Sequence, residues 1–120
     1  MRGPLTHKDL DVWKRALCLA ELTYRVSRSF PSEERFGLTI QMRRASVSIL
    51  RNISEGAARR ARAEYVHFLH IARGSLAELD AQSSLAARLN FGAGVMHGLQ
   101  EEIDRVGKLL GAQISALKRE

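Results

Sequence analysis

Apolar residues recur every three or four positions along four segments of this chain. That period predicts four helices, at residues 9–29, 32–55, 63–90 and 95–118. Phe30-Pro31, Gly56 and Phe91-Gly92 end the first three. The connections are short, which favours antiparallel neighbours. We therefore expect an all-α fold, an antiparallel up-down-up-down four-helix bundle, as a single domain over residues 1–120 with its ordered part at about residues 8–118.

The third and fourth predicted helices each carry one narrow apolar stripe, which is the ordinary face of a bundle helix. These stripes predict the core. Its expected members are Leu76, Leu79, Leu99, Ile103, Val106 and Leu110.

The first and second predicted helices carry apolar residues over a much wider arc, roughly 220° at about 100° per residue. One bundle seam cannot bury an arc of that width. Either much apolar surface is exposed, or these helices also face another subunit, and large exposed patches usually mark interfaces. We favour a homo-oligomer. The expected interface residues are Leu17, Leu22, Phe36, Ile40, Arg43, Val47 and Leu50.

Arg43 lies inside the apolar arc of the second predicted helix. It either pairs across a subunit interface or extends its head into water from a buried stem. At the end of that helix, Gly56 suits the left-handed position after the last turn. Asn52 and Glu55 are expected to cap backbone donors there rather than to catalyse a reaction.

The net charge is +6 and is unevenly distributed. Residues 1–62 carry thirteen basic and six acidic side chains, whereas residues 63–120 carry six and seven. A basic half favours a polyanionic partner, although it also serves solubility. No aromatic residues interleave with the loop arginines, so any nucleic-acid binding should tolerate sequence changes. The candidate nucleic-acid-binding residues are Lys14, Arg25, Arg28, Arg44, Arg51, Arg59, Arg60 and Arg62.

No catalytic or cofactor-binding motif appears, so we expect neither an enzyme nor a cofactor. His67 and His70, with Glu64, have a spacing that could suggest a metal site, but both histidines project away from the apolar stripe. We therefore expect no metal. Cys18 is the one cysteine, which excludes an internal disulfide; it is either an exposed thiol or an interface residue. No segment has membrane-spanning length and no leader is visible, so we expect a soluble cytoplasmic protein.

Several short motifs, taken together and in order, resemble a known bacterial family. They are Asp9-Leu10-Asp11-Val12-Trp13, Phe30-Pro31-Ser32-Glu33-Glu34-Arg35-Phe36-Gly37, Arg43-Arg44-Ala45-Ser46-Val47-Ser48-Ile49, Asn52-Ile53-Ser54-Glu55-Gly56 and Ala72-Arg73-Gly74-Ser75-Leu76-Ala77-Glu78. The chain resembles the four-helix-bundle proteins encoded in intervening sequences of large-subunit ribosomal RNA genes. It also resembles the related accessory proteins of diversity-generating retroelements.

The resemblance implies a ring-like homopentamer without known catalytic activity. It also implies that the family-motif residues are largely structural; these are Arg44, Ser48, Asn52, Glu55, Gly56, Gly74, Ser75 and Glu78. The retroelement relatives bind nucleic acid and a reverse transcriptase. We therefore expect a non-enzymatic oligomeric adaptor, whose partners are itself, RNA or DNA, and a reverse transcriptase, with no membrane. The alternative is a structural or protein-interaction scaffold without a nucleic-acid role.

Overall fold

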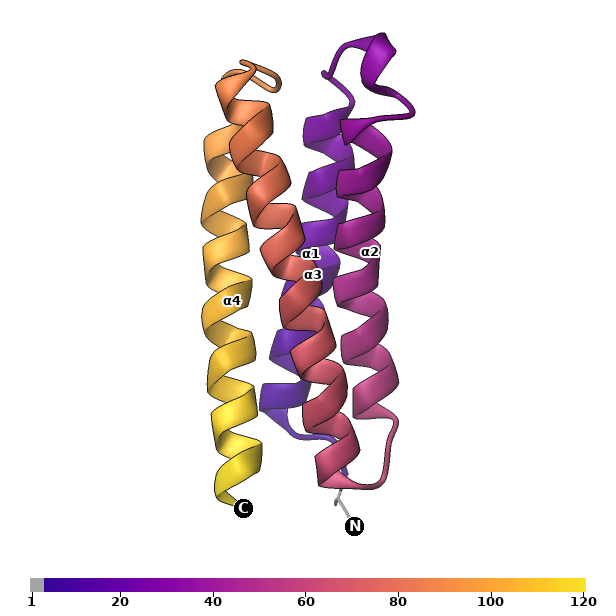
Figure 1. Cartoon of the computed structure of the whole chain (residues 1–120). Helices are drawn as coiled ribbons and strands as arrows, with labels where there is room; N and C mark the ends of the chain where they lie inside the picture. Colours follow the sequence, from indigo (N-terminus) through magenta and orange to yellow (C-terminus); the bar gives the residue numbers. More distant parts are fainter. Residues whose placement is uncertain (1–3) are drawn as a thin grey trace.

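The computed structural model describes residues 4–120, which form four α-helices and one short 3-10 turn (Figure 1). The elements are α1 (His7–Ser27), η1 (Ser32–Glu34), α2 (Leu38–Ala57), α3 (Arg62–Arg88) and α4 (Met96–Arg119). No strand occurs within residues 4–120. The predicted all-α fold class is confirmed.

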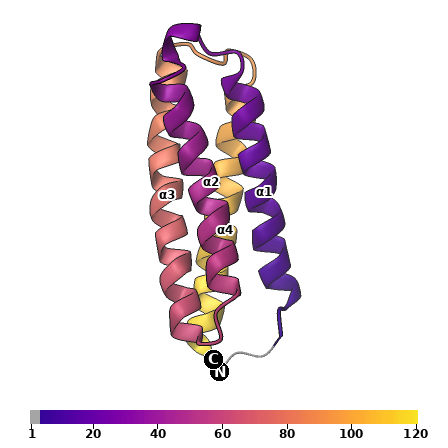
Figure 2. The ribbon, with the colours of Figure 1, turned by 90° about the vertical axis from the view of Figure 1, so that its right-hand side faces the viewer.

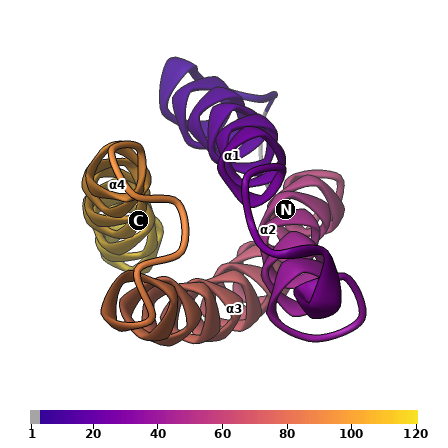
Figure 3. The same cartoon turned by 90° about the horizontal axis from the view of Figure 1, so that it is seen from above.

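The helices form an antiparallel bundle, with α1 beginning and α4 ending at the same end (Figures 1 and 2). Each helix packs against two others, in the cyclic order α1, α2, α3, α4 (Figure 3). The bundle measures 48 × 23 × 18 Å. Every helix therefore keeps one outward side along its whole length. Over residues 4–120, no helix combines the length and the apolar character needed to cross a membrane.

The core lies along the axis of the bundle, where the stripes of all four helices meet. All six predicted core residues are buried: Leu76, Leu79, Leu99, Ile103, Val106 and Leu110. Met42, Ile49 and Ile53 of α2 and Leu19 of α1 belong to the same cluster. The core prediction is confirmed because it rested on helical period, which determines the buried side of an amphipathic helix.

The predicted start of the second helix, at residue 32, is wrong. Residues 32–34 form the separate turn η1, and α2 begins only at Leu38, after the N-cap Gly37. Phe36 is the one apolar residue between η1 and α2, and its side chain is 84% exposed. Since no side chain there packs into the core, nothing stabilises a helix at this point. The Glu34 carboxylate instead accepts a hydrogen bond from the Leu38 amide, at 3.2 Å.

The predicted roles at the end of this helix are also wrong. Gly56 is helical and buried, and is not among the positive-φ residues of the described chain. Asn52 does not cap: its side-chain amide donates to the Ser48 carbonyl, at 2.8 Å. Glu55 forms an ion pair with Arg59, at 2.5 Å. Gly56 is needed for close packing, because a Cβ there would lie 2.8 Å from Phe68 Cβ.

A buried polar cluster joins three helices at the end where α1 begins. Asp9 is only 3% exposed. Its Oδ1 accepts from the Tyr65 hydroxyl of α3 at 2.7 Å and from the Gln113 amide of α4 at 2.6 Å. Its Oδ2 accepts from the backbone and hydroxyl of Thr6, which caps α1. The cluster sets the height of α1 relative to α3 and α4.

Candidate functional site

The outer side of α2 carries alternating apolar and basic side chains. Ile40, Arg44, Val47 and Arg51 are spaced four, three and four residues apart, which places them on one face of a helix. Both arginines are exposed, Val47 is 40% exposed and Ile40 is half-buried. We call these four residues the α2 stripe. Its two apolar members depart from the purely polar outer face that a bundle helix usually shows.

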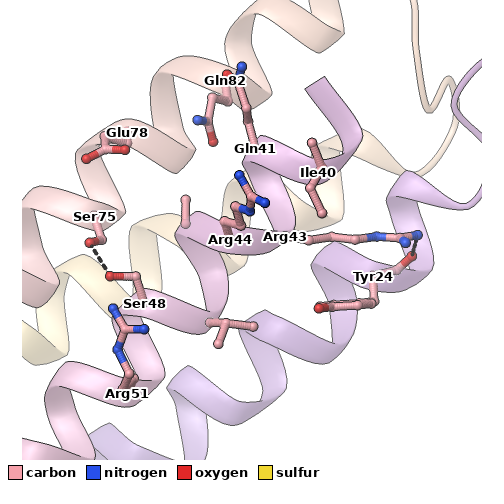
Figure 4. Close-up of a pocket in the computed structure, with 12 residues that line it drawn as sticks. Tyr24, Ile40, Gln41, Arg43, Arg44, Ser48, Arg51, Ser75, Glu78 and Gln82 are labelled. Carbon is pink, nitrogen blue, oxygen red and sulfur yellow. Dashed lines mark hydrogen bonds between the residues drawn. The ribbon is translucent and has the colours of Figure 1, made fainter. Parts of the chain in front are cut away.

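A groove of about 650 Å³ runs beside the α2 stripe, between α2 and α3 (Figure 4). At its floor, the hydroxyls of Ser48 and Ser75 form a hydrogen bond of 2.9 Å that joins the two helices. Asn52 also donates to the Ser48 hydroxyl, at 3.2 Å. Glu78 and Gln82 belong to the α3 wall. The Gln82 Oε1 is buried, and no hydrogen-bond partner for it exists within residues 4–120.

Arg44 and Arg51 have no ion-pair partner in the part of the chain that the structure describes. Arg43, their neighbour on the α1 side, is bound within the subunit. Its Nε donates to the Ser27 hydroxyl at 2.8 Å, and its guanidinium lies 4.7 Å from the centre of the Tyr24 ring. From the sequence, Arg43 is expected to pair across a subunit interface or to extend its head into water. The structure shows neither role, because the guanidinium contacts α1 of the same subunit. Arg43 therefore serves the α1–α2 seam, while Arg44 and Arg51 point away from it.

Most of the predicted interface residues line the outer side of the α1–α2 seam. Phe36 and Val47 are exposed, and Leu17, Ile40 and Leu50 are half-buried. Leu22 lies apart from them: it is seven residues after Arg15, which pairs with Glu102 of α4, so it faces α4.

Sequence reasoning missed two aromatic residues on the same seam. Trp13 is 37% exposed and donates to the Ser54 hydroxyl of α2 at 2.9 Å, and Tyr24 is 39% exposed. Both belong to the wide apolar arc of the first helix, so the signal is present in the sequence. The seam therefore exposes more apolar surface than the predicted residues alone suggest.

The eight candidate nucleic-acid-binding residues lie in three separate groups. On α1, Lys14 lies in the groove towards α4, whereas Arg25 and Arg28 lie near the C-terminal end. Arg44 and Arg51 belong to the α2 stripe. Arg59 and Arg60 lie in the loop between α2 and α3, and Arg62 is the first residue of α3, at the opposite end of the bundle from Arg28.

Three of these eight cations are already paired within the chain. Arg25 pairs with Glu21, and Arg59 pairs with Glu55 and Glu64. Arg62 pairs with the Glu120 carboxylate. The five without an ion pair in residues 4–120 are Lys14, Arg28, Arg44, Arg51 and Arg60.

The remaining candidates for chemistry lie apart from one another. His67 and His70 are exposed on α3, as predicted from their position off the apolar stripe. Within residues 4–120, no three histidine, cysteine or acidic side chains are grouped closely enough to hold a metal ion. Cys18 is an exposed thiol beside Lys14 and Arg105.

A family profile described as 23S rRNA-intervening sequence protein matches residues 8–112. The chain belongs to this family. The match includes α1, α2 and α3 almost entirely, together with the groove, the α2 stripe and the loop arginines.

The fold is shared with solved structures, of which one is described here. It is that of a protein of unknown function from the S23 ribosomal protein family of Bacteroides thetaiotaomicron. The identity is 24%, the TM-score is 0.81, and the match covers 90% of this chain and 98% of the other. The search of the curated proteins found no match.

Neither the family description nor this relative's description names an enzymatic activity. The family description refers to ribosomal RNA and names no ligand. The structure adds a surface with exposed apolar side chains and with cations that form no ion pair within residues 4–120. Such a surface suits binding rather than catalysis.

Proposed function

We propose that this protein is a non-enzymatic homo-oligomeric adaptor that acts in the cytoplasm. In this proposal the subunits assemble through the outer side of the α1–α2 seam, as a pentamer by the resemblance described above. The assembly binds nucleic acid, or a protein that processes it, through basic residues outside the subunit contacts. A reverse transcriptase is a candidate partner on the resemblance alone.

The observation that carries the proposal is the α2 stripe together with the seam beside it. Trp13, Tyr24 and Val47 expose large apolar side chains on adjacent helices. A contiguous exposed apolar surface on a small domain usually marks an interface. Removing that surface from water favours association, at roughly 25 cal/mol per Å² of apolar area before the cost of association is subtracted.

Nucleic-acid binding is supported by Lys14, Arg28 and Arg60, the three candidate cations outside the α2 stripe that lack an ion pair within residues 4–120. Each retains a full charge for a phosphate, and neutralised phosphates release counterions, which makes the affinity steeply salt-dependent. Repetition around a ring multiplies weak contacts by avidity. The family's description in terms of ribosomal RNA agrees with an RNA-related role.

Assembly is tested by light scattering after size exclusion, at micromolar concentration. The expected mass is a multiple of 13.4 kDa. Val47→Glu should shift the mass towards that of one subunit, because a carboxylate would be buried in the contact. A wild-type protein with the mass of one subunit would contradict the assembly.

Nucleic-acid binding is tested by fluorescence anisotropy with mixed-sequence RNA and DNA oligonucleotides over a salt series. Lys14→Ala/Arg28→Ala/Arg60→Ala should weaken binding and flatten the salt dependence, by about one unit of log–log slope for each cation that no longer neutralises a phosphate. The matched control is Arg73→Ala/Arg88→Ala/Lys108→Ala, which removes the same charge from α3 and α4, where these cations also lack ion pairs within residues 4–120. Equally weakened binding in both variants would show that binding follows net charge alone.

A second candidate is a scaffold without a nucleic-acid role. The observation that favours it is the pairing of Arg25, Arg59 and Arg62 with carboxylates of the same chain. An assembled protein that binds neither RNA nor DNA at low salt would support the scaffold.

A further inference from the structure

The loop between α1 and α2 carries the most exposed large apolar side chain within residues 4–120. This side chain is that of Phe36, which is 84% exposed. Phe30 of the same loop is buried, and its ring packs on that of Phe91 with the ring centres 5.6 Å apart. The two loops at this end of the bundle are thus joined without Phe36. Its ring has no part in the core, so the fold does not explain why a phenylalanine stands there.

Hydrogen bonds within the loop hold Phe36 in its exposed position. The Glu34 amide donates to the Pro31 carbonyl at 2.9 Å, and the Gly37 amide donates to the Glu34 carbonyl at 3.0 Å. The loop extends beyond the end of α2 (Figure 1). An aromatic ring on an ordered loop loses little conformational freedom when a flat partner stacks on it, which favours binding at this place.

Arginines lie on both sides of Phe36 in the chain, where the loop begins and where it ends. The Arg35 guanidinium lies 4.9 Å from the centre of the Phe36 ring, so it covers one face and leaves the other to solvent. Arg28 is the C-cap of α1 and begins the loop. Neither arginine forms an ion pair within residues 4–120, although the loop also carries Glu33 and Glu34.

An accessible aromatic face beside free arginines suits an unpaired base and its phosphates. Stacking of a base on an aromatic side chain adds affinity and tolerates any sequence, because every base has a π-face. A base inside a duplex is already stacked and has to leave the duplex to reach such a ring. We infer that Phe36 is a stacking platform for an unpaired base, with Arg28 and Arg35 binding adjacent phosphates. This inference rests on the nucleic-acid binding proposed above and names the preferred form of the ligand, a single strand.

A nucleic-acid strand fits this place better than a second copy of the chain, although the sequence places Phe36 among the expected interface residues. Trp13 and Val47, which support the proposed assembly, lie along the sides of α1 and α2, whereas Phe36 precedes the first residue of α2. A strand supplies flat apolar surface for the ring and phosphates for the arginines, whose planar heads suit both.

The first test replaces the ring and keeps an apolar side chain. Phe36→Leu should weaken binding of a single-stranded RNA oligonucleotide without internal pairs about fivefold, and binding of the matched duplex by less than about twofold. Phe36→Trp should bind the single strand at least as tightly as the wild type, because its ring also stacks. Fluorescence anisotropy measures each affinity. Equal affinity of the wild type and Phe36→Leu for the single strand, or a Phe36→Trp variant as weak as Phe36→Leu, would overturn the inference.

The matched control is Leu89→Ala. Leu89 follows the last residue of α3, at the same end of the bundle, and is 50% exposed. Its side chain is apolar but has no ring, so its loss should leave both affinities unchanged. Single-strand binding weakened as much as in Phe36→Leu would mean that any apolar surface at this end suffices, and would contradict a stacking platform.

The second test separates stacking from charge through the salt dependence. Stacking neutralises no phosphate, so Phe36→Leu should lower the single-strand affinity by the same factor at every salt concentration. Arg28→Ala/Arg35→Ala should instead flatten the dependence, by about 0.7 units of log–log slope for each cation that no longer neutralises a phosphate of a single strand. A Phe36→Leu variant whose slope flattens as much as that of the double variant would contradict the inference.

Failure of this inference is distinguishable from failure of the proposed function. If the wild type binds nucleic acid and Phe36→Leu binds single strand and duplex as the wild type does, the platform is wrong and the proposed phosphate contacts stand. If the wild type binds neither RNA nor DNA at low salt, both are wrong. If Phe36→Leu retains its fold by circular dichroism but has a smaller mass by light scattering, Phe36 belongs to a subunit contact and the inference fails.

Discussion

The buried cluster around Asp9 and the α2 stripe differ in how their charged side chains are exposed and bonded. Asp9 is almost wholly buried, and its two oxygens accept hydrogen bonds from three other residues of the same chain. Arg44 and Arg51 are exposed and form no ion pair within residues 4–120. A buried charge must be satisfied inside the subunit, whereas an exposed one is free to bind another molecule.

The comparison separates stability from function within one small bundle. At the Asp9 end, polar contacts determine how α1 sits against α3 and α4. On the stripe, the charges form no ion pair within residues 4–120, and apolar residues lie between them. The buried charge that supports the fold and the exposed charges proposed for binding therefore lie on different parts of the molecule. Substitutions in the two regions should affect different measurements.

The largest expected effect comes from removing the Asp9 carboxylate. Asp9→Ala should lower the free energy of unfolding by about 3 kcal/mol, because Tyr65 and Gln113 are then left without a charged acceptor in a buried place. Asp11→Ala removes the same charge from an exposed position of α1 and should lower it by less than about 1 kcal/mol. Urea unfolding of both variants measures the difference. Equal destabilisation would mean that burial of Asp9 is not what matters.

A smaller destabilisation is expected at Gly56, where α2 approaches α3 closely. Gly56→Ala should lower the free energy of unfolding by about 1–2 kcal/mol, since the new Cβ forces α3 outward and outweighs the gain in helix propensity. Gly111→Ala is the matched control, because a Cβ there meets nothing within 4 Å. It should raise the melting temperature. A stabilised Gly56→Ala variant would show that the helices separate easily at this point.

The Ser48–Ser75 hydrogen bond at the floor of the groove should contribute still less to the free energy of unfolding. Ser48→Ala removes the hydroxyl that Ser75 and Asn52 contact, and should lower the free energy of unfolding by about 1 kcal/mol. Ser84→Ala is the control, because its hydroxyl donates to the Asp80 carbonyl on an exposed side of α3. Thermal unfolding of the two variants distinguishes them. No difference between them would mean that Ser48 and Ser75 contribute nothing measurable.

The smallest expected effect on the subunit is at the stripe itself. Arg51→Ala should change the free energy of unfolding by less than about 0.5 kcal/mol, as surface substitutions do. The measurement is made at a protein concentration below that at which the subunits assemble, so that assembly does not add to stability. A decrease above about 1 kcal/mol would show that Arg51 stabilises its own subunit, and would remove the contrast with Asp9.

The capping box at the start of α1 shows how far local features of the sequence determine the site. Thr6 and Asp9 have the spacing of that motif, so their mutual hydrogen bonds are predictable. The contacts of Asp9 with Tyr65 and Gln113 are not, because those residues are 56 and 104 positions away. The seam residues show a similar limit. The wide arcs of α1 and α2 indicate excess apolar surface, but not that Leu22 faces α4.

Helical period by itself determined the four helices, their core stripes and the excess of apolar residues on α1 and α2. It could do so because each of these depends on residues within a few turns of one helix. The tertiary structure decided that Arg43 binds α1 while Arg44 and Arg51 form no ion pair within residues 4–120, and that Gly56 serves close packing rather than a left-handed turn. It also decided that Ser48 and Ser75 lie at one height. These depend on how α2 is rotated and shifted against its neighbours, and that is determined by contacts between residues far apart in the sequence.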